Sequence, residues 1–234
     1  MRRRRPALTS RPRAMNDLAG AAAGLVYAAA VLVLLVVQTW RQHRATGSTG
    51  FNGFRGATQD LAARLAGIGF VMAVLIGLGA PWLTATGTLP AWPLPIMVGA
   101  FGIVVAAAGL QLGVAAQRAM GRSWRIGVDQ NESTNLVVDG PFRLVRNPIF
   151  TALMMLQAGT AAMALTWLSL LGAALMFAAC QVQTRLVEEP YLLRHHEDSY
   201  RGYGAQTGRF VPGCGRLRPL GPVPAPHRTA GGEA

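Results

Sequence analysis

The chain has 234 residues, of which 51% are hydrophobic and only 14% are charged, and its formal net charge is +12. Soluble domains carry about 25% charged residues, so this composition, with apolar blocks of about 20 residues, predicts an integral membrane protein. All 22 basic residues are arginine, and they lie at the ends of the apolar blocks. Such flanks suit lipid headgroups and membrane topology, so nucleic acid is excluded as a partner.

The N-terminal part predicts two membrane helices, within residues 18–93. Residues 1–17 are arginine- and proline-rich and are expected to be disordered. Leu18–Trp40 is uncharged over 23 residues, enough to cross a ~30 Å hydrocarbon core and too long for a signal peptide. Leu65–Leu83 predicts the second span, with Arg64 at one end.

Three further spans are expected beyond residue 93. Leu94–Gln117 is apolar and rich in small residues that permit close helix packing. Ile149–Thr184 runs for 36 residues without a charge, which as one helix would measure about 54 Å. Because that length is nearly twice the hydrocarbon core, the segment must break near Thr166-Trp167 into a tight helical hairpin. The fold class is therefore an all-α integral membrane protein with about five transmembrane helices.

With five spans, the polar regions 41–60, 118–147 and 185–234 lie on one side of the membrane. They hold fifteen arginines, against six in the N-terminal segment on the other side, so the first side is expected to be cytoplasmic. If translation starts at Met15, the six N-terminal arginines that oppose this orientation are absent from the protein. The expected location is the bacterial cytoplasmic membrane, with the functional site facing the cytoplasm.

Two stretches on that side carry the chemistry. Asp139–Phe150 contains two arginines and is bent by Pro141 and Pro148, which restrict the residues before them to extended geometry. Glu188 and Glu189 follow the last span directly, where ionisable groups are costly unless paired or used. No metal site is expected, because adjacent histidines on a helix diverge and the two cysteines are far apart.

The motifs in these stretches resemble those of the isoprenylcysteine carboxyl methyltransferase family. G-P-F-R-L-V-R-N-P-I-F, at residues 140–150, is similar to the family's G-P-Y-R-x-x-R-H-P-x-Y. L-V-E-E-P-Y-L-L, S-Y-R-G-Y and G-R-F-V-P-G look like its C-terminal motifs. The resemblance covers roughly residues 95–213, within a core expected at 94–213 and before a disordered tail at 214–234. The wider group of membrane methyltransferases includes phospholipid N-methyltransferases.

The resemblance implies an S-adenosylmethionine-dependent methyltransferase whose cytoplasmic cofactor cleft is closed by a C-terminal helix. The acceptor would be a small lipophilic molecule or lipid, with a carboxylate or thiol favoured over an amine because no general base is evident. The residues implied in catalysis are Arg143, Arg146, Glu188 and Arg209. Those implied in cofactor binding are Leu136, Gly140, Pro141, Arg146, Asn147, Pro148, Phe150, Glu188, Glu189, Tyr200 and Tyr203.

The chain departs from the family pattern in three places. Asn147 replaces a histidine and cannot titrate, Phe150 replaces a tyrosine, and Pro190 should distort the helix after Glu189. Two other classes stay open, an NADPH-dependent sterol-type membrane reductase and a non-enzymatic membrane scaffold. The reductase would want clustered basic residues for the cofactor's 2′-phosphate, whereas this tail begins with paired acids.

Overall fold

The computed structural model describes residues 10–47, 61–121 and 136–218. Within these ranges the regular structure is helical, apart from one isolated parallel bridge between Val145 and Gly208. Four helices are long and apolar enough to cross a membrane. The predicted fold class, an all-α membrane protein, is therefore confirmed.

The first membrane helix contains a π-helical turn. α1 (Ser10–Val31) continues through η1 (Leu32–Val37) into α2 (Gln38–Thr46), and Gly47, with φ 74°, caps the C-terminus of α2. The helix thus begins inside the segment expected to be disordered, because extending a formed helix costs far less than nucleating one. Residues 1–9, which include the rest of that segment, lie outside the described residues.

Two further long helices follow, α3 (Leu61–Ala85) and α4 (Ile96–Met120). The shorter apolar helix α5 (Pro148–Met163) begins inside the strip Asp139–Phe150, and α6 (Trp167–Val182) follows it. The long apolar run therefore breaks close to the expected position. The count of five spans and the tight hairpin stay predictions, because α5 is shorter than the four long helices.

A capping box fixes the start of α6. The Thr166 hydroxyl oxygen accepts from the Ser169 backbone N–H at 3.0 Å, and the Ser169 hydroxyl oxygen accepts from the Thr166 N–H at 2.9 Å. Both side chains are buried. Two backbone donors that would otherwise be orphaned at the membrane turn are satisfied in this way.

Glycines bring α4 and α5 into backbone contact. A Cβ atom placed on Gly102 would lie 2.5 Å from the Gly159 carbonyl oxygen, and one on Gly159 would lie 2.6 Å from the Ala106 nitrogen. Small residues allow this approach, which in lipid is a main source of helix association because apolar burial alone gives little. The small-residue pattern of the third predicted span therefore has a specific partner, α5.

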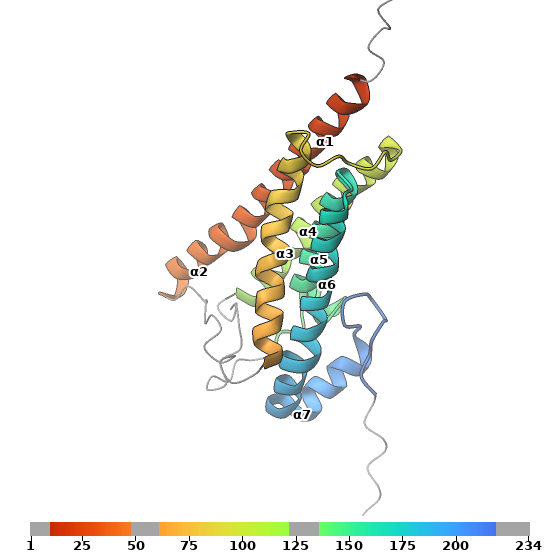
Figure 1. The fold of residues 1–234 in the computed structure, drawn as a ribbon. Helices are drawn as coiled ribbons and strands as arrows, with labels where there is room; N and C mark the ends of the chain where they lie inside the picture. The colour runs from red at the N-terminus through yellow and green to blue at the C-terminus, as the bar shows by residue number, and fades with distance from the viewer. Residues whose placement is uncertain (1–9, 48–60, 122–135, 219–234) are drawn as a thin grey trace, which may run out of the picture.

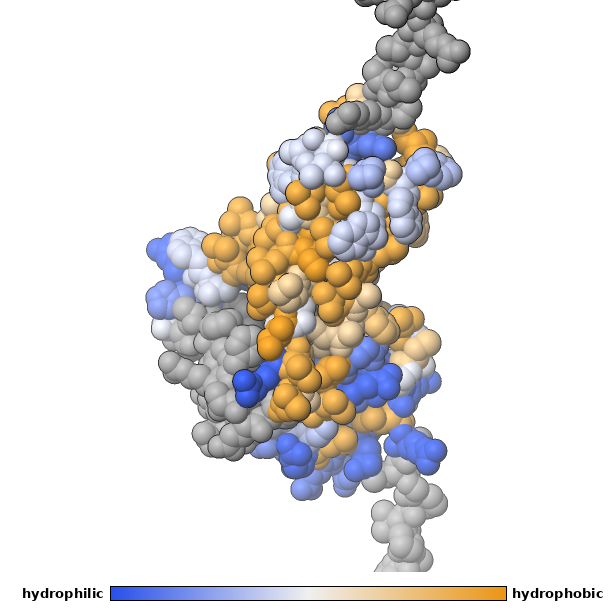
Figure 2. All heavy atoms as spheres, in the orientation of Figure 1, coloured by the Kyte–Doolittle hydropathy of each residue, from blue (hydrophilic) through white to orange (hydrophobic). Residues whose placement is uncertain are grey.

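The last helix leaves the membrane before its end. α6 continues through the π-helical turn η4 (Gln183–Glu188) into α7 (Glu189–Gln206). The 40 residues from Trp167 would measure about 60 Å, twice the hydrocarbon core. Figure 1 shows α7 turned aside below the bundle, where Figure 2 shows hydrophilic side chains below the apolar middle. We therefore take the membrane part of this helix to end before Glu188, and α7 as lying outside it.

Candidate functional site

The strip Asp139–Phe150 lies alongside the C-terminal segment Gly204–Leu217. The Arg146 N–H donates to the Gly208 carbonyl at 2.8 Å, and the Asn147 N–H donates to the Arg209 carbonyl at 3.1 Å. Beside them is the Val145–Gly208 bridge. Two stretches about sixty residues apart in sequence thus form one wall, continuous with the start of α5.

The two prolines shape the strip. Pro141 lies in the first turn of a short 3₁₀ helix, η3 (Gly140–Arg143), and Gly140 before it adopts φ 60°. Pro148 starts α5, and Asn147 before it is non-helical, with φ −126° and ψ 62°. Because proline disfavours helical geometry in the preceding residue, the backbone N–H groups of Arg146 and Asn147 stay free to bind the C-terminal segment.

The side chain of Arg146 holds the strip against the C-terminal segment. It is buried, with a residue exposure of 5%. Its Nη1 atom donates to the carbonyls of Gly204, at 3.0 Å, and Thr207. Its Nη2 atom donates to the Glu189 Oε1 atom at 2.7 Å and to the Gly215 carbonyl at 3.0 Å. Protein acceptors therefore occupy both terminal nitrogens of the guanidinium.

Glu189 is held by two arginines. Arg209 donates from Nε to Oε1 and from Nη2 to Oε2, each at 2.8 Å, and Arg146 shares Oε1. Burial raises the pKa of Glu189, but hydrogen bonds from Arg209 and Arg146 outweigh it and hold the pKa below its ordinary value. The carboxyl stays ionised at neutral pH, and both its oxygens are engaged.

Glu188 has a different environment, although it is the adjacent residue. Its carboxylate accepts one long hydrogen bond, 3.3 Å, from the Gln183 side chain, and no arginine pairs with it among the described residues. Burial, with a smaller contribution from the Glu189 charge, raises the pKa of Glu188 to about 7. Both oxygens of Glu189 are therefore engaged by arginines of the protein, whereas Glu188 is available to bind a ligand.

Other predicted site residues complete the wall. The Tyr203 hydroxyl donates to the Phe142 carbonyl at 2.6 Å, and its ring lies edge-on to that of Tyr200, which is 2% exposed. The Asn147 amide donates to the Arg209 carbonyl at 3.2 Å. The Thr151 hydroxyl, which the sequence analysis did not single out, donates to the Phe210 carbonyl at 2.9 Å.

Several predicted residues lie elsewhere. Phe150 stacks on Phe70 of α3, with ring centroids 5.5 Å apart, and packs against a buried cluster that includes Met176 and Phe210. Arg143 forms a pair with Asp139 at 3.1 Å in which both side chains are more than three-quarters exposed. Pro148 is buried, Leu136 and Pro141 are half-buried, and Gly140 is exposed. Arg143 therefore lies outside the cluster that Arg146, Arg209 and Glu189 form.

The main-chain acceptors that Arg146 binds, unlike Glu189, had no sequence signal. They are main-chain carbonyls of Gly204, Thr207 and Gly215, which any residue type would supply. Among the described residues no three His, Cys, Asp or Glu side chains gather as a metal would require.

In this bundle of membrane-length helices, the strip meets the glutamate pair through the contact of Arg146 with Glu189. Residues 97–199 match the model of the family described as phospholipid methyltransferase (PEMT). The match covers α4 to α7 as far as Ser199, and it confirms the predicted resemblance to the membrane methyltransferase group. It does not single out the isoprenylcysteine carboxyl methyltransferases. No curated protein and no solved structure gives a significant match.

Proposed function

We propose that this chain is an S-adenosylmethionine-dependent methyltransferase that acts on a lipophilic acceptor reaching it from the bilayer. The observation that carries the proposal is the contrast between the two glutamates, inside a segment that matches the phospholipid methyltransferase family. Glu189 is enclosed by Arg146 and Arg209, whereas Glu188 keeps a carboxylate without a cationic partner among the described residues. A half-buried, unpaired carboxylate suits a cationic ligand.

The residues present fit the cofactor. S-adenosylmethionine carries ammonium and sulfonium cations and, when bound, supplies an electrophilic methyl group. Glu188 would attract one of these cations, and its raised pKa would fall toward the ordinary value as the pair forms. Arg146, Glu189 and Arg209 would hold the wall against which the cofactor lies. Of the two glutamates implied in cofactor binding, Glu188 is therefore the one that would contact the cofactor.

The chain's contribution to the reaction would be positioning and exclusion of water, because methyl transfer is an in-line displacement. Asn147 cannot act as a base, and its amide is engaged with the Arg209 carbonyl. A carboxylate or thiolate acceptor needs no base, so it remains the first candidate. Arg209, whose side chain is 15% exposed and is fixed by Glu189, would orient such an anion.

An amine acceptor is the second candidate, and one observation favours it. The pKa of Glu188 near 7 leaves this carboxylate partly ionised at neutral pH, which is the condition for an effective general base. The matched family's description, phospholipid methyltransferase, names phospholipids, some of which carry amine headgroups. Under this alternative Glu188 would face the acceptor in place of a cofactor cation, and it would accept a proton from the acceptor ammonium before transfer.

Cofactor binding by the purified full chain in detergent tests the proposal. We expect saturable binding of S-adenosylmethionine and none of NADPH. Glu188→Gln should weaken cofactor binding at least tenfold while leaving the thermal midpoint within a few degrees of wild type. Binding of NADPH alone would favour the reductase, and binding of neither would favour the scaffold. Methyl transfer from labelled cofactor to extracted lipids, compared with soluble fatty acids, would then identify the acceptor.

A further inference from the structure

The helix α4 has two opposite faces, one packed inside the bundle and one exposed. The packed face carries the small residues that meet α5, and it is buried at Gly109 and Gly113. Gln111 is two residues from each of these glycines. At about 100° per residue, its side chain therefore points about 160° away from both of them. Gln111 is accordingly exposed, on the side of α4 opposite to α5.

Gln111 lies well inside the apolar part of α4. The helix has no charge from Ile96 to Gln117, and Arg118 marks its polar end. At 1.5 Å per residue, Gln111 is about 10 Å inside that end and about 22 Å from Ile96. Because helical side chains lean toward the N-terminus, the Gln111 amide leans away from the nearer polar edge. The groups around an exposed side chain at this depth are hydrocarbon rather than water or headgroups.

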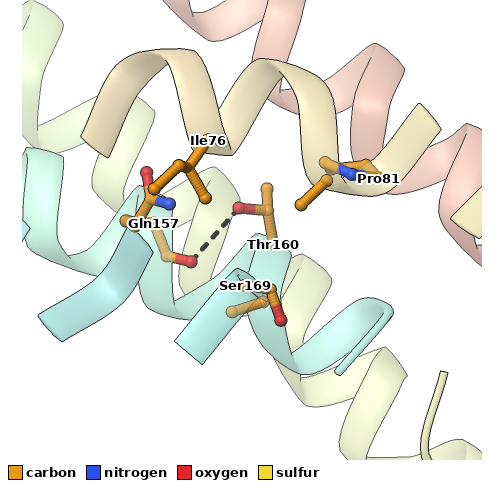
Figure 3. Close-up of a pocket in the computed structure, with 8 residues that line it drawn as sticks. Ile76, Pro81, Gln157, Thr160 and Ser169 are labelled. Atoms are coloured by element: carbon orange, nitrogen blue, oxygen red, sulfur yellow. Dashed lines mark hydrogen bonds between the residues drawn. The ribbon is translucent and has the colours of Figure 1, made fainter. Parts of the chain in front are cut away.

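The Gln111 amide has no hydrogen-bond partner among the described residues. Two other glutamines of the bundle are covered by protein instead. Gln117 is 7% exposed and donates to the Leu34 carbonyl at 2.9 Å. Gln157 of α5 is 2% exposed and lies beside Ile76 of α3, at the edge of a small cavity (Figure 3). An amide that faces hydrocarbon without a partner is costly, so Gln111 requires a polar group from outside the described bundle.

The exposed residues on the same side of α4 follow a seven-residue repeat. Steps of alternately three and four residues are the pattern by which one helix packs along another over several turns, and membrane helices mostly pack in this geometry. Two alanines in the series allow close approach of the backbones. The series, in which the last residue is half-buried and the others are exposed, is Met97, Ala100, Val104, Ala107, Gln111 and Val114.

We propose that two copies of this chain associate in the membrane through this face of α4. Both copies insert with the same orientation, so the two α4 helices run parallel and each position of the series meets its own counterpart. An amide carries a carbonyl acceptor and N–H donors, so the two Gln111 side chains donate to each other across the two-fold axis. The contact satisfies the polar groups that each copy leaves unpaired. This association does not depend on the proposed methyltransferase activity.

Disulfide cross-linking of the full chain in membranes tests the position of the interface. The exposed native thiol is first removed by Cys214→Ser. In that background, Ala107→Cys places a thiol on the proposed face, and mild oxidation should give a covalent dimer. Leu75→Cys is the matched control, because Leu75 is 56% exposed on α3, outside the proposed face, and should give no dimer. Absence of the dimer in Ala107→Cys, or equal yields in the two variants, would overturn the proposal.

Energy transfer between labelled copies in detergent tests the role of the amide. Gln111→Leu keeps the size of the side chain and suits the apolar helix, so the chain should fold, but the dissociation constant should rise about threefold or more. Gln111→Asn retains an amide and should recover part of the affinity, whereas Leu75→Ala should leave the dissociation constant unchanged. A wild type that stays monomeric at every concentration, or equal dissociation constants in wild type and Gln111→Leu, would contradict the proposed contact.

Discussion

The Arg146 Nη2 atom lies 2.7 Å from the Glu189 Oε1 atom, joining residues 43 positions apart in a pair that is almost fully buried. Arg209 completes this pair from the other side of the carboxylate. A buried carboxylate between two arginines stabilises only as long as each charge keeps its partner. The C-terminal segment is thus fixed to the strip by charge as well as by main-chain hydrogen bonds, and we expect it to be a wall rather than a loose lid.

Glu189→Gln should destabilise the fold strongly. The change leaves two arginines without their shared anion, which at a buried site costs about 3–5 kcal/mol, reduced here because Arg209 is partly exposed. Thermal unfolding in detergent measures the effect. Glu188→Gln is the matched control and should change the midpoint much less, because Glu188 has no arginine partner among the described residues. Equal losses in the two variants would contradict the division of roles.

The two glutamates should have opposite effects on stability as pH changes. The lowered pKa of Glu189 contributes stability that is present above the ordinary carboxyl pKa and is lost as pH falls through the lowered value. The raised pKa of Glu188, about 7, contributes stability that is present below the ordinary value and is lost as pH rises toward 7. Thermal midpoints should be measured from pH 3 to pH 8. The loss of stability at acid pH should vanish in Glu189→Gln, and the loss of stability toward neutral pH should vanish in Glu188→Gln.

Arg209→Lys should loosen the C-terminal segment without unfolding the bundle. An ammonium group cannot reproduce the paired Nε and Nη2 hydrogen bonds to Glu189. We expect faster amide hydrogen exchange for residues 207–215 and unchanged exchange in α4 and α5. Arg143→Lys is the control, because its ion pair with Asp139 is exposed and contributes at most about 1 kcal/mol. Unchanged exchange at 207–215 in Arg209→Lys would show that the wall does not depend on this arginine.

Gly159→Ala should disrupt the packing of α4 against α5. A Cβ atom at this position would lie 2.6 Å from the Ala106 nitrogen and from the Gly102 carbonyl oxygen, which are backbone atoms that cannot rotate away. Overpacking of this kind costs about 1–3 kcal/mol or more. Gly79→Ala is the control, because nothing lies within 4 Å of its added Cβ and alanine favours the helix by about 0.5–1 kcal/mol. The midpoint should fall in the first variant and stay level or rise in the second.

The sequence by itself determined the fold class, the approximate spans and the group of proteins that residues 97–199 match. Uncharged runs of about 20 residues have few alternatives to membrane helices, and the R-N-P and E-E motifs are local patterns. The break near Thr166 followed from length alone. Pro190 was expected to distort its helix; it lies in the first turn of α7, and the π-helical turn Gln183–Glu188 ends two residues before it.

Only the tertiary structure decided what each motif residue contacts. Glu188 and Glu189 are adjacent residues of the same type, yet Glu189 contacts two arginines and Glu188, the last residue of the π-helical turn, contacts a single amide. The main-chain acceptors of Arg146 carry no side-chain signal, and Phe150 turned out to pack in the core against Phe70. Such assignments depend on contacts between distant residues, because a local pattern fixes which groups are present and only the packing of helices fixes how they meet.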